Sequence, residues 1–328
     1  MISMPRRLLP AGLLIALLLL GIGSAGAQTY PNRPIRFIVG FSAGGITDIV
    51  ARIMADHVRN KLGQSVIVEN RTGANGMVAA TEVARAAPDG YTVLISNSST
   101  LTLNPLLYKK SQYEISDFLP VSLMVSYPFI LAINPANEKN SSVATLNDLI
   151  RLARDKPGQF TYGSTGQGGL VHLGFELINQ LADIKMVHVP YRGAAAAQLA
   201  LLSKEIDIAF ENPTSLAQFK SGKIKALAVT SPERWRDLPD VPSVSELGYP
   251  GFDASSWVGA VVHARTPPAA VKTLYDAIRS AATDPATRAL LMQHGNIPML
   301  DPQQFAAKIK AETEVNAKVI RQAAITLD

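Results

Sequence analysis

The feature that most constrains this chain is an order of predicted elements that occurs twice. Near the N-terminus, three apolar runs typical of buried strands alternate with two segments of helical periodicity. The strands are expected at residues 35–41, 65–70 and 91–96, and the helices at about 47–62 and 77–87. The same order returns with strands at 159–163, 186–190 and 206–210 and helices at 170–182 and 194–202. Because a βαβαβ order favours a parallel sheet covered by helices, we expect a two-lobed α/β fold, each lobe a mainly parallel sheet flanked by helices.

Two further apolar runs, at 121–134 and 255–264, are expected to connect the lobes, and three C-terminal helices would complete the first lobe. Those helices are expected at about 268–282, 287–294 and 302–323. The first lobe would then comprise residues 28–125 and 256–328, and the second lobe residues 126–255, with a ligand cleft between them. A chain of 328 residues with 47% hydrophobic content is long enough to form more than one core.

The first 27 residues have the pattern of a secretory signal peptide. Arg6 and Arg7 form a positive region, an apolar stretch follows at 8–22, and Ala25-Gly26-Ala27 is a small-residue cleavage site. The apolar stretch is shorter than the roughly 20 residues of a membrane-spanning helix. We therefore expect cleavage near Ala27 and export to the periplasm. The general secretory route is favoured, although an Arg-Arg pair also suits the twin-arginine route.

Composition and motifs argue against several classes of function. The chain has no cysteine, which excludes disulfides, thiolate metal sites and a cysteine nucleophile. No basic run is interleaved with aromatic residues, so no nucleic-acid partner is expected. There is no P-loop motif, and Gly166 and Gly168 lack the third glycine of a dinucleotide fingerprint, where Val171 stands. The five histidines form no pair at metal-ligand spacing, and we expect neither a cofactor nor a metal site.

We also expect no catalytic residues and therefore no enzyme. The segment around Ser164 is not G-x-S-x-G, because Tyr162 stands where the first glycine belongs. One alternative is a secreted serine-type hydrolase or transferase that uses Ser164 or Ser98 with His172 and an acid. That alternative needs a histidine within hydrogen-bond reach of one of the two hydroxyls. A second alternative is a ligand-sensing partner of a membrane signalling protein.

Glycine-rich turns follow the first strand of each predicted lobe, with "FSAGG" at 41–45 and "STGQGG" at 164–169. Exposed N–H groups at the start of a helix attract anions, which favours backbone capture of a carboxylate. The alternative is a turn that only needs positive φ or close packing. Ligands bind such sheets beyond the carboxyl ends of the strands, so these turns and the loops at 97–100 and 211–214 would line one cleft. The candidate ligand-binding residues are Phe41, Ser42, Ala43, Gly44, Gly45, Thr47, Asp48, Ser96, Asn97, Ser98, Ser164, Thr165, Gly166, Gly168, Gly169, His172, Arg192 and Glu211.

Several candidates also have structural interpretations. Thr47 and Asp48 commonly cap a helix, and His172 suits helix packing or capping as well as ligand contact. Glu211 is the acid expected at the cleft. It would accept a hydrogen bond from a ligand's hydroxyl or ammonium group, or bond to the backbone of its own loop.

Arginines follow the second predicted strand of each lobe. Arg192 would suit a distal carboxylate, which a guanidinium binds with two parallel hydrogen bonds, whereas a solvent-exposed salt bridge is expected for Arg71. The rings of Phe41, Tyr191 and Trp257 could lie near the cleft. Aromatic acids therefore stay open beside aliphatic dicarboxylates, hydroxy acids and amino acids.

Longer segments of the chain resemble one family. They are "YPNRPIRFIVGFSAGGITDIVAR", "VIVENRTGANGMVAATEVARAAPDGYTVLI", "LNPLLYKK", "MVHVPYRG" and "KALAVTSPERWRDLPDVPSVSELGYPGF". With the final helices they are similar, over essentially the whole mature chain, to the Bug family, the extracytoplasmic solute receptors of tripartite tricarboxylate transporters. The resemblance implies a Venus-flytrap periplasmic binding protein that takes up a small organic carboxylate and works with membrane permease subunits. We expect it to be a monomer.

The resemblance also implies how the ligand is held. The first Gly-Gly turn and the Ser/Thr/Gly-rich turn of the second lobe would grip the carboxylate, partly through ordered water. Ala43 stands where the family commonly has proline, and Glu211 stands where aspartate is frequent. Both positions face the expected ligand, so the resemblance does not name the carboxylate.

Overall fold

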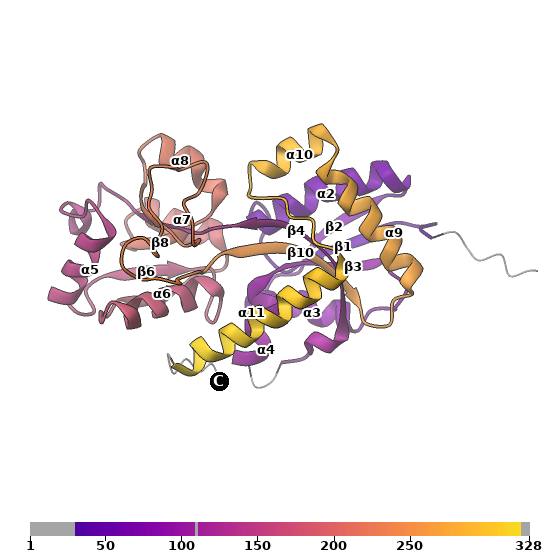
Figure 1. Cartoon of the computed structure of the whole chain (residues 1–328), viewed down its shortest axis with the longest axis horizontal. Coiled ribbons are helices and arrows are strands. Elements are labelled where there is room, and N and C mark those ends of the chain that lie inside the picture. Colours follow the sequence, from indigo (N-terminus) through magenta and orange to yellow (C-terminus); the bar gives the residue numbers. More distant parts are fainter. Residues whose placement is uncertain (1–29, 109–110, 323–328) are drawn as a thin grey trace, which may run out of the picture.

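The computed structural model describes residues 30–108 and 111–322, so the expected signal peptide at residues 1–27 lies outside the described residues. The described chain forms two five-stranded sheets, each flanked by helices, which lie side by side along the long axis (Figure 1). We call the sheet that contains β1, with its helices, the first lobe, and the sheet that contains β5, with its helices, the second lobe. The predicted two-lobed α/β fold is confirmed.

In the first lobe, three parallel strands precede an antiparallel pair, and the order across the sheet is β2-β1-β3-β10-β4. The strands are β1 (Ile35–Val39), β2 (Val66–Asn70), β3 (Thr92–Asn97), β4 (Phe118–Tyr127) and β10 (Ser256–His263). The apolar run of β1 is buried at every position except Arg36, as expected for a strand covered on both faces. The helices are α2 (Ile46–Leu62), α3 (Met77–Ala84), α4 (Asn104–Leu107), α9 (Pro268–Arg279), α10 (Pro285–Met292) and α11 (Pro302–Gln322).

The second lobe repeats the first arrangement, with the order β7-β6-β8-β5-β9. β6 (Thr161–Ser164) pairs in parallel with β7 (Val187–Pro190) and β8 (Ile208–Glu211), and β5 (Ile130–Ile133) is antiparallel to β8. The helices are α5 (Leu146–Asp155), α6 (Leu170–Leu181), α7 (Ala194–Leu202) and α8 (Leu216–Lys220). Neither α5 nor the edge strand β9 (Lys225–Val229) was expected from the sequence pattern.

The apolar run at 121–134 is two strands rather than one. β4 belongs to the first sheet and β5 to the second, so the chain crosses between the lobes at residues 128–129. It returns between β9 and β10, directly before the second apolar run that the sequence analysis proposed as a connection.

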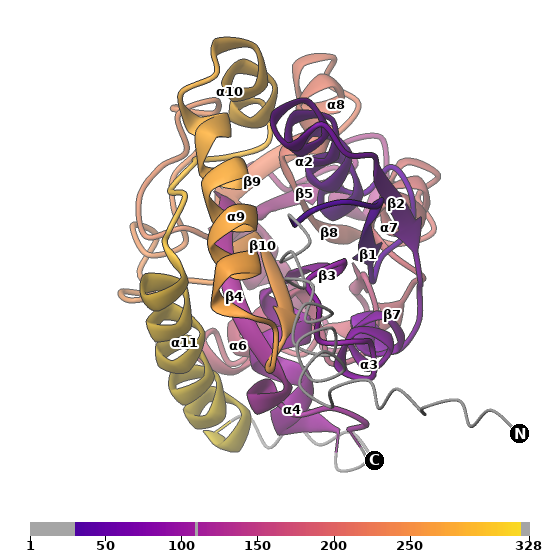
Figure 2. The same cartoon turned by 90° about the vertical axis from the view of Figure 1, so that its right-hand side faces the viewer.

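The three C-terminal helices return to the first lobe, as predicted. α9 and α11 pack against β4, and α10 packs against α2, which places all three on the first lobe (Figures 1 and 2). Trp257 on β10 packs under α11, edge-to-face against Phe305, and its indole N–H donates to Glu312 at 2.7 Å. The expectation that the Trp257 ring lies near the cleft is therefore wrong.

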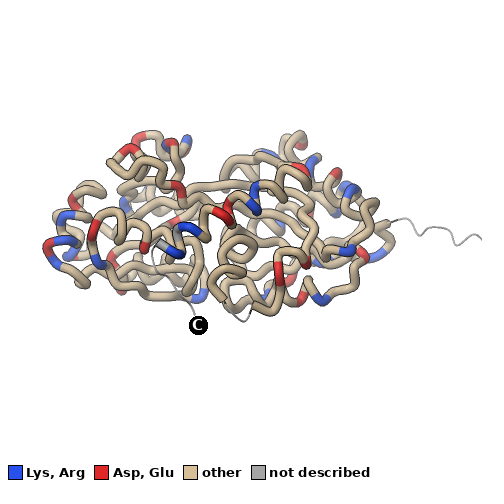
Figure 3. Tube along the Cα trace, turned by 60° about the horizontal axis from the view of Figure 1, so that its bottom comes forward, with Lys and Arg blue, Asp and Glu red and all other residues tan. Residues whose placement is uncertain are grey.

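Charged residues of both signs occur along the chain in each lobe (Figure 3). Acidic and basic residues are interspersed over both lobes on the side that Figure 3 shows. Within residues 30–108 and 111–322, the helices are either too short or too polar to cross a membrane.

Candidate functional site

Loops from both lobes meet around a small, deep cavity of about 50 Å³. Phe41 follows β1, Asn97 ends β3, Thr165 follows β6 and Asn212 follows β8, and all four line this cavity. The four strand-end loops picked out in the sequence therefore share one cavity. This follows from the topology, because parallel strands end at the same edge of a sheet.

Two helices, one from each lobe, begin at this deep cavity. Gly45 precedes α2 and Gly193 precedes α7, and neither helix start has a side-chain cap among the described residues. Ile46 and Thr47 of α2 and the first two alanines of α7 line the cavity. The first N–H groups of a helix have no intrahelical acceptor, and the macrodipole makes this end positive. The deep cavity is therefore suited to an anion.

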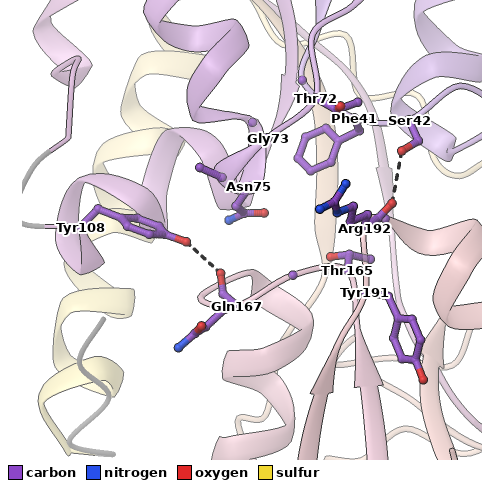
Figure 4. A pocket seen from close by; sticks show the side chains of 15 residues that line it. Phe41, Ser42, Thr72, Gly73, Asn75, Tyr108, Thr165, Gln167, Tyr191 and Arg192 are labelled. Carbon is purple, nitrogen blue, oxygen red and sulfur yellow. Dashed lines mark hydrogen bonds between the residues drawn. The ribbon is translucent and has the colours of Figure 1, made fainter. Parts of the chain in front are cut away.

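A larger cavity of about 450 Å³, which Figure 4 shows and which we call the outer cavity, adjoins the deep one. Phe41 and Ser42 line both cavities. The loop at 72–76, Tyr108 and Arg192 form much of its wall. Arg192 is exposed and makes no ion pair with any described residue, and no described carboxylate lines either cavity. The free guanidinium therefore adds positive charge at the outer end of the site.

Three hydrogen bonds join the lobes directly around the cavities. Ser42 Oγ donates to the carbonyl oxygen of Arg192 at 3.2 Å, and the Tyr108 hydroxyl donates to the carbonyl oxygen of Gln167 at 3.0 Å (Figure 4). Ser99 Oγ accepts from the backbone N–H of Leu170 at 2.9 Å. In each bond the first lobe contributes a side-chain hydroxyl and the second lobe a backbone group. The structure is therefore in a closed arrangement.

Most of the chain matches the sequence model of one protein family. Residues 50–325 match the family described as "Tripartite tricarboxylate transporter family receptor". The chain belongs to this receptor family. The protein BugT of Bordetella pertussis is 34% identical over 325 residues, which cover 98% of each chain.

Solved structures show the same fold as this receptor. The periplasmic binding protein BugD is 32% identical, with a TM-score of 0.84 over 90% of this chain and 99% of that one. A structure of R. palustris Rpa4515 with adipate is 30% identical, with a TM-score of 0.85 over 90% and 99% of the two chains. MatC from Rhodopseudomonas palustris with bound malate is 28% identical, with a TM-score of 0.82 over 89% and 100%.

The structure divides the residues that sequence reasoning selected in this receptor into two groups. The first group lines one or both cavities: Phe41, Ser42, Gly45, Thr47, Asn97, Thr165, Gly166 and Arg192. The second group lines neither cavity: Ala43, Gly44, Asp48, Ser96, Ser98, Ser164, Gly168, Gly169, His172 and Glu211. Three members of the second group, Asp48, Ser164 and His172, hydrogen-bond to the backbone of the glycine turns.

The buried Asp48 side chain hydrogen-bonds to the backbone of the first glycine turn and stabilises it. Its carboxylate accepts from the backbone N–H of Gly44 at 3.0 Å, from Arg52 at 2.9 and 3.0 Å, and from Asn70 at 2.9 Å. Burial opposes charge on Asp48, but these hydrogen bonds outweigh it and lower the pKa of the carboxyl. Because the N–H of Gly45 also has an acceptor, the carbonyl of Ser42 at 3.3 Å, the free donors at this turn belong to the first residues of α2.

A histidine pair supports the second glycine turn. His188 Nε2 lies 2.6 Å from Ser164 Oγ, and its ring stacks on His172 with centroids 3.9 Å apart. His172 Nδ1 accepts from the backbone N–H of Gly168 at 3.1 Å. The histidine at Ser164 is therefore His188, whereas the hydrolase alternative required His172. Burial and the neighbouring His172 lower the pKa of His188 to about 4.

Glu211 lines neither cavity, and the partners of its carboxylate are side chains rather than the expected backbone N–H groups of its own loop. The side chain is buried, and its carboxylate accepts from Gln198 at 2.9 Å and from the Ser215 hydroxyl. Burial raises the pKa of the Glu211 carboxyl, although both hydrogen bonds oppose the rise. Ser98 is likewise occupied, since its Oγ lies 2.9 Å from Ser256 Oγ.

Sequence reasoning missed the loop after β2, Thr72–Gly76, and Tyr108, all of which line the outer cavity. A signal for the loop was available. β2 is parallel to β1, so the loop after β2 must emerge at the same edge of the sheet as the glycine turn after β1.

Proposed function

We propose that this receptor captures a small organic carboxylate between its lobes in the periplasm and delivers it to the membrane permease of a tripartite transporter. The observation that carries the proposal is the deep cavity, where uncapped starts of α2 and α7 meet and no described carboxylate lines the wall. The bound adipate and malate in related receptors support a carboxylate as the ligand.

The two cavities suggest separate roles for their residues. The first N–H groups of α2 and α7, with the Thr47 and Thr165 hydroxyls, would hold the proximal carboxylate, partly through ordered water. Phe129 and Val171 would contact the aliphatic part of the ligand in the deep cavity. Arg192 would bind a second carboxylate in the outer cavity with two parallel hydrogen bonds.

Binding would be coupled to movement of the lobes. We take residues 28–127 with 256–328 and residues 128–255 as two bodies that close about the connections between them, because β4 of the first sheet extends to Tyr127, two residues beyond the expected boundary at 125. A ligand that contacts both bodies favours the closed state because it binds that state more tightly. Export with cleavage near Ala27, a monomeric state and the absence of catalysis belong to the same proposal. Ser164 is buried beside His188 and lines neither cavity, which supports a structural role for this pair.

Thermal unfolding with a ligand panel tests the proposal. The panel pairs each carboxylate with its neutral primary amide, for example adipate with adipamide and malate with malamide. A ligand at 100 times its Kd stabilises the folded state by about 2.7 kcal/mol, which raises Tm by several degrees. We expect at least one carboxylate to raise Tm and its amide to leave it unchanged. A panel in which amides stabilise as well as the acids would contradict anion capture.

A further inference from the structure

The loop after β2 has a backbone conformation that is rare for L-amino acids. Gly73, Ala74, Asn75 and Gly76 have φ angles of +139°, +44°, +52° and +85°. Glycine adopts such angles freely and asparagine tolerates them, whereas alanine does not favour them. A loop of this kind persists only where its surroundings hold it.

Two buried side chains of the first lobe hold the loop. Thr100 Oγ1 donates to the carbonyl oxygen of Asn75 at 3.0 Å. Asn104 Nδ2 donates to the same oxygen at 3.0 Å and to the carbonyl oxygen of Ala74 at 3.5 Å. Thr100 and Asn104 are both fully buried, so the loop is fixed from inside the lobe.

The same network fixes the orientation of the Asn75 amide. Asn104 Nδ2 donates to two backbone carbonyl oxygens, so the other end of this amide, Asn104 Oδ1, faces the Asn75 side chain. An amide oxygen accepts hydrogen bonds, so Asn75 must present its N–H group to it. Asn75 Nδ2 donates to Asn104 Oδ1 at 2.8 Å. Asn75 Oδ1 is therefore turned away from Asn104. It is buried and has no hydrogen-bond partner in the described part of the chain.

This free oxygen belongs to a residue that lines the outer cavity. Figure 4 shows the carboxamide oxygen of Asn75 on the side of the cavity where Arg192 lies. The amide oxygens of Asn97 and Asn212, which line the deep cavity, already accept from backbone N–H groups of their own loops. Asn75 therefore offers an acceptor that the protein itself does not use.

Closure of the lobes shields Asn75 Oδ1 from bulk water. The oxygen lies against the start of α6 in the second lobe, where a Cβ placed on Gly169 would be 3.3 Å from it. A buried acceptor without a donor weakens any complex that leaves it unpaired. A ligand enclosed in the cleft that carries a donor would supply the missing hydrogen bond.

We propose that Asn75 makes this receptor selective for carboxylates that carry a hydroxyl substituent, whose O–H donates to Asn75 Oδ1. This inference rests on the proposed function and adds the ligand class. An ammonium substituent would also donate, but the Arg192 guanidinium lines the same cavity and repels a second cation. A hydroxyl meets the acceptor without that repulsion.

Titration calorimetry on matched acids tests the selectivity of the purified receptor. Each pair differs by one hydroxyl: propionate and lactate, succinate and malate, adipate and 2-hydroxyadipate. For the best-fitting pair we expect the hydroxy acid to bind about 5- to 30-fold more tightly, the range for one buried hydrogen bond. Asn75→Gly should reduce that ratio to near one, because glycine keeps the positive φ and removes the acceptor.

Asp183→Gly is the matched control. It serves this purpose better than any change in the loop itself, because Ala74 also lines the outer cavity. Asp183 has a φ of +51°, against +52° for Asn75, but it is exposed and lines neither cavity, so Asp183→Gly should leave the ratio at its wild-type value. If carboxylates bind and Asn75→Gly weakens both members of a pair equally, the inference about Asn75 is wrong while the proposed function stands. If none of the acids binds the wild-type receptor, both fail.

Discussion

The segments that follow β2 and β7 occupy equivalent positions in the two lobes, yet their arginines are used differently. Arg71 follows β2 and forms ion pairs with Glu69 at 2.6 Å and Glu82 at 3.1 Å. Arg192 follows β7, makes no ion pair with a described residue and lines the outer cavity. One arginine is part of the surface of its lobe, and the other remains available to a ligand.

The difference comes from the neighbouring elements. Glu69 lies on β2 and Glu82 on α3, beside the start of the first-lobe loop. The corresponding elements in the second lobe, β7 and α7, carry the sequences VHVP and AAAAQLALL, with no acidic residue. An arginine between such elements has no local partner. Acidic residues on the adjacent strand and helix therefore distinguish Arg71, which forms ion pairs within its lobe, from Arg192, which is available to a ligand.

Removing the charge of Arg192 and of Arg71 in turn should give the largest difference in ligand affinity between the two positions. Arg192→Gln should weaken binding of a dicarboxylate such as adipate about 10- to 100-fold, because a charge-assisted hydrogen bond contributes roughly 1.5–3 kcal/mol. Binding of hexanoate, which lacks the second carboxylate, should change little. Titration calorimetry with both acids measures the difference.

Arg71→Gln is the control for this comparison. Arg36 also pairs with Glu69 and Glu82, at 2.6 and 2.8 Å, so both acids keep a partner when Arg71 is removed. Exposed pairs contribute at most about 1 kcal/mol, and binding should be unaffected. Equal losses of adipate affinity in the two variants would show that Arg192 contributes only to the net charge of the protein and does not contact the ligand.

The order of elements made the fold and the meeting of the four strand-end loops predictable from sequence, because topology decides which loops share an edge. The atoms that stay free at the site were not predictable. Asp48 takes the Gly44 N–H, His188 meets Ser164 from 24 residues away, and Asn104 orients Asn75 from 29 residues away. The last two contacts depend on packing between separate segments, and hydrophobic periodicity carries no signal for any of the three.

The lobes should also differ in their response to acid. His188 in the second lobe has a pKa of about 4, below its ordinary 6.5, because burial and His172 disfavour its charged form. The unfolded chain takes up this proton below about pH 6.5, and the folded chain does so only near pH 4. The stability present above pH 6.5 is therefore lost as the pH falls, by about 1–2 kcal/mol at pH 5. Denaturant unfolding at pH 7 and at pH 5 measures this difference in the free energy of unfolding.

Single substitutions assign this loss to a lobe. His188→Gln keeps an amide that can meet Ser164 and removes the titration, so the stability difference between pH 7 and pH 5 should shrink. His57 in the first lobe is also buried, which lowers its pKa, but Asp284 opposes that shift. His57→Gln should therefore flatten the pH dependence less than His188→Gln does. The opposite order would mean that the histidine stack under the second glycine turn does not control acid sensitivity.

The smallest predicted effect concerns closure itself, where the first lobe contributes hydroxyls and the second lobe contributes backbone groups. Tyr108→Phe removes the O–H that donates to Gln167, and Ser42→Ala removes the one that donates to Arg192. Neither of these exposed bonds should contribute more than about 1 kcal/mol, which predicts roughly 2- to 5-fold weaker binding.

The loss from Tyr108→Phe should be the same for every ligand, because a shift towards the open state lowers the binding-competent fraction and multiplies all dissociation constants alike. Changes at Arg192 or Asn75 should instead depend on the ligand, since those side chains would touch it. Calorimetry with hexanoate, adipate and malate separates the two patterns, and solution scattering should show a larger radius of gyration for the ligand-free variant. A loss confined to one acid would make Tyr108 a ligand contact. An equal loss of affinity for all three acids would show that Tyr108 stabilises the closed state. In that state, side-chain hydroxyls of the first lobe bond to backbone groups of the second lobe, and no side-chain substitution can remove those backbone groups.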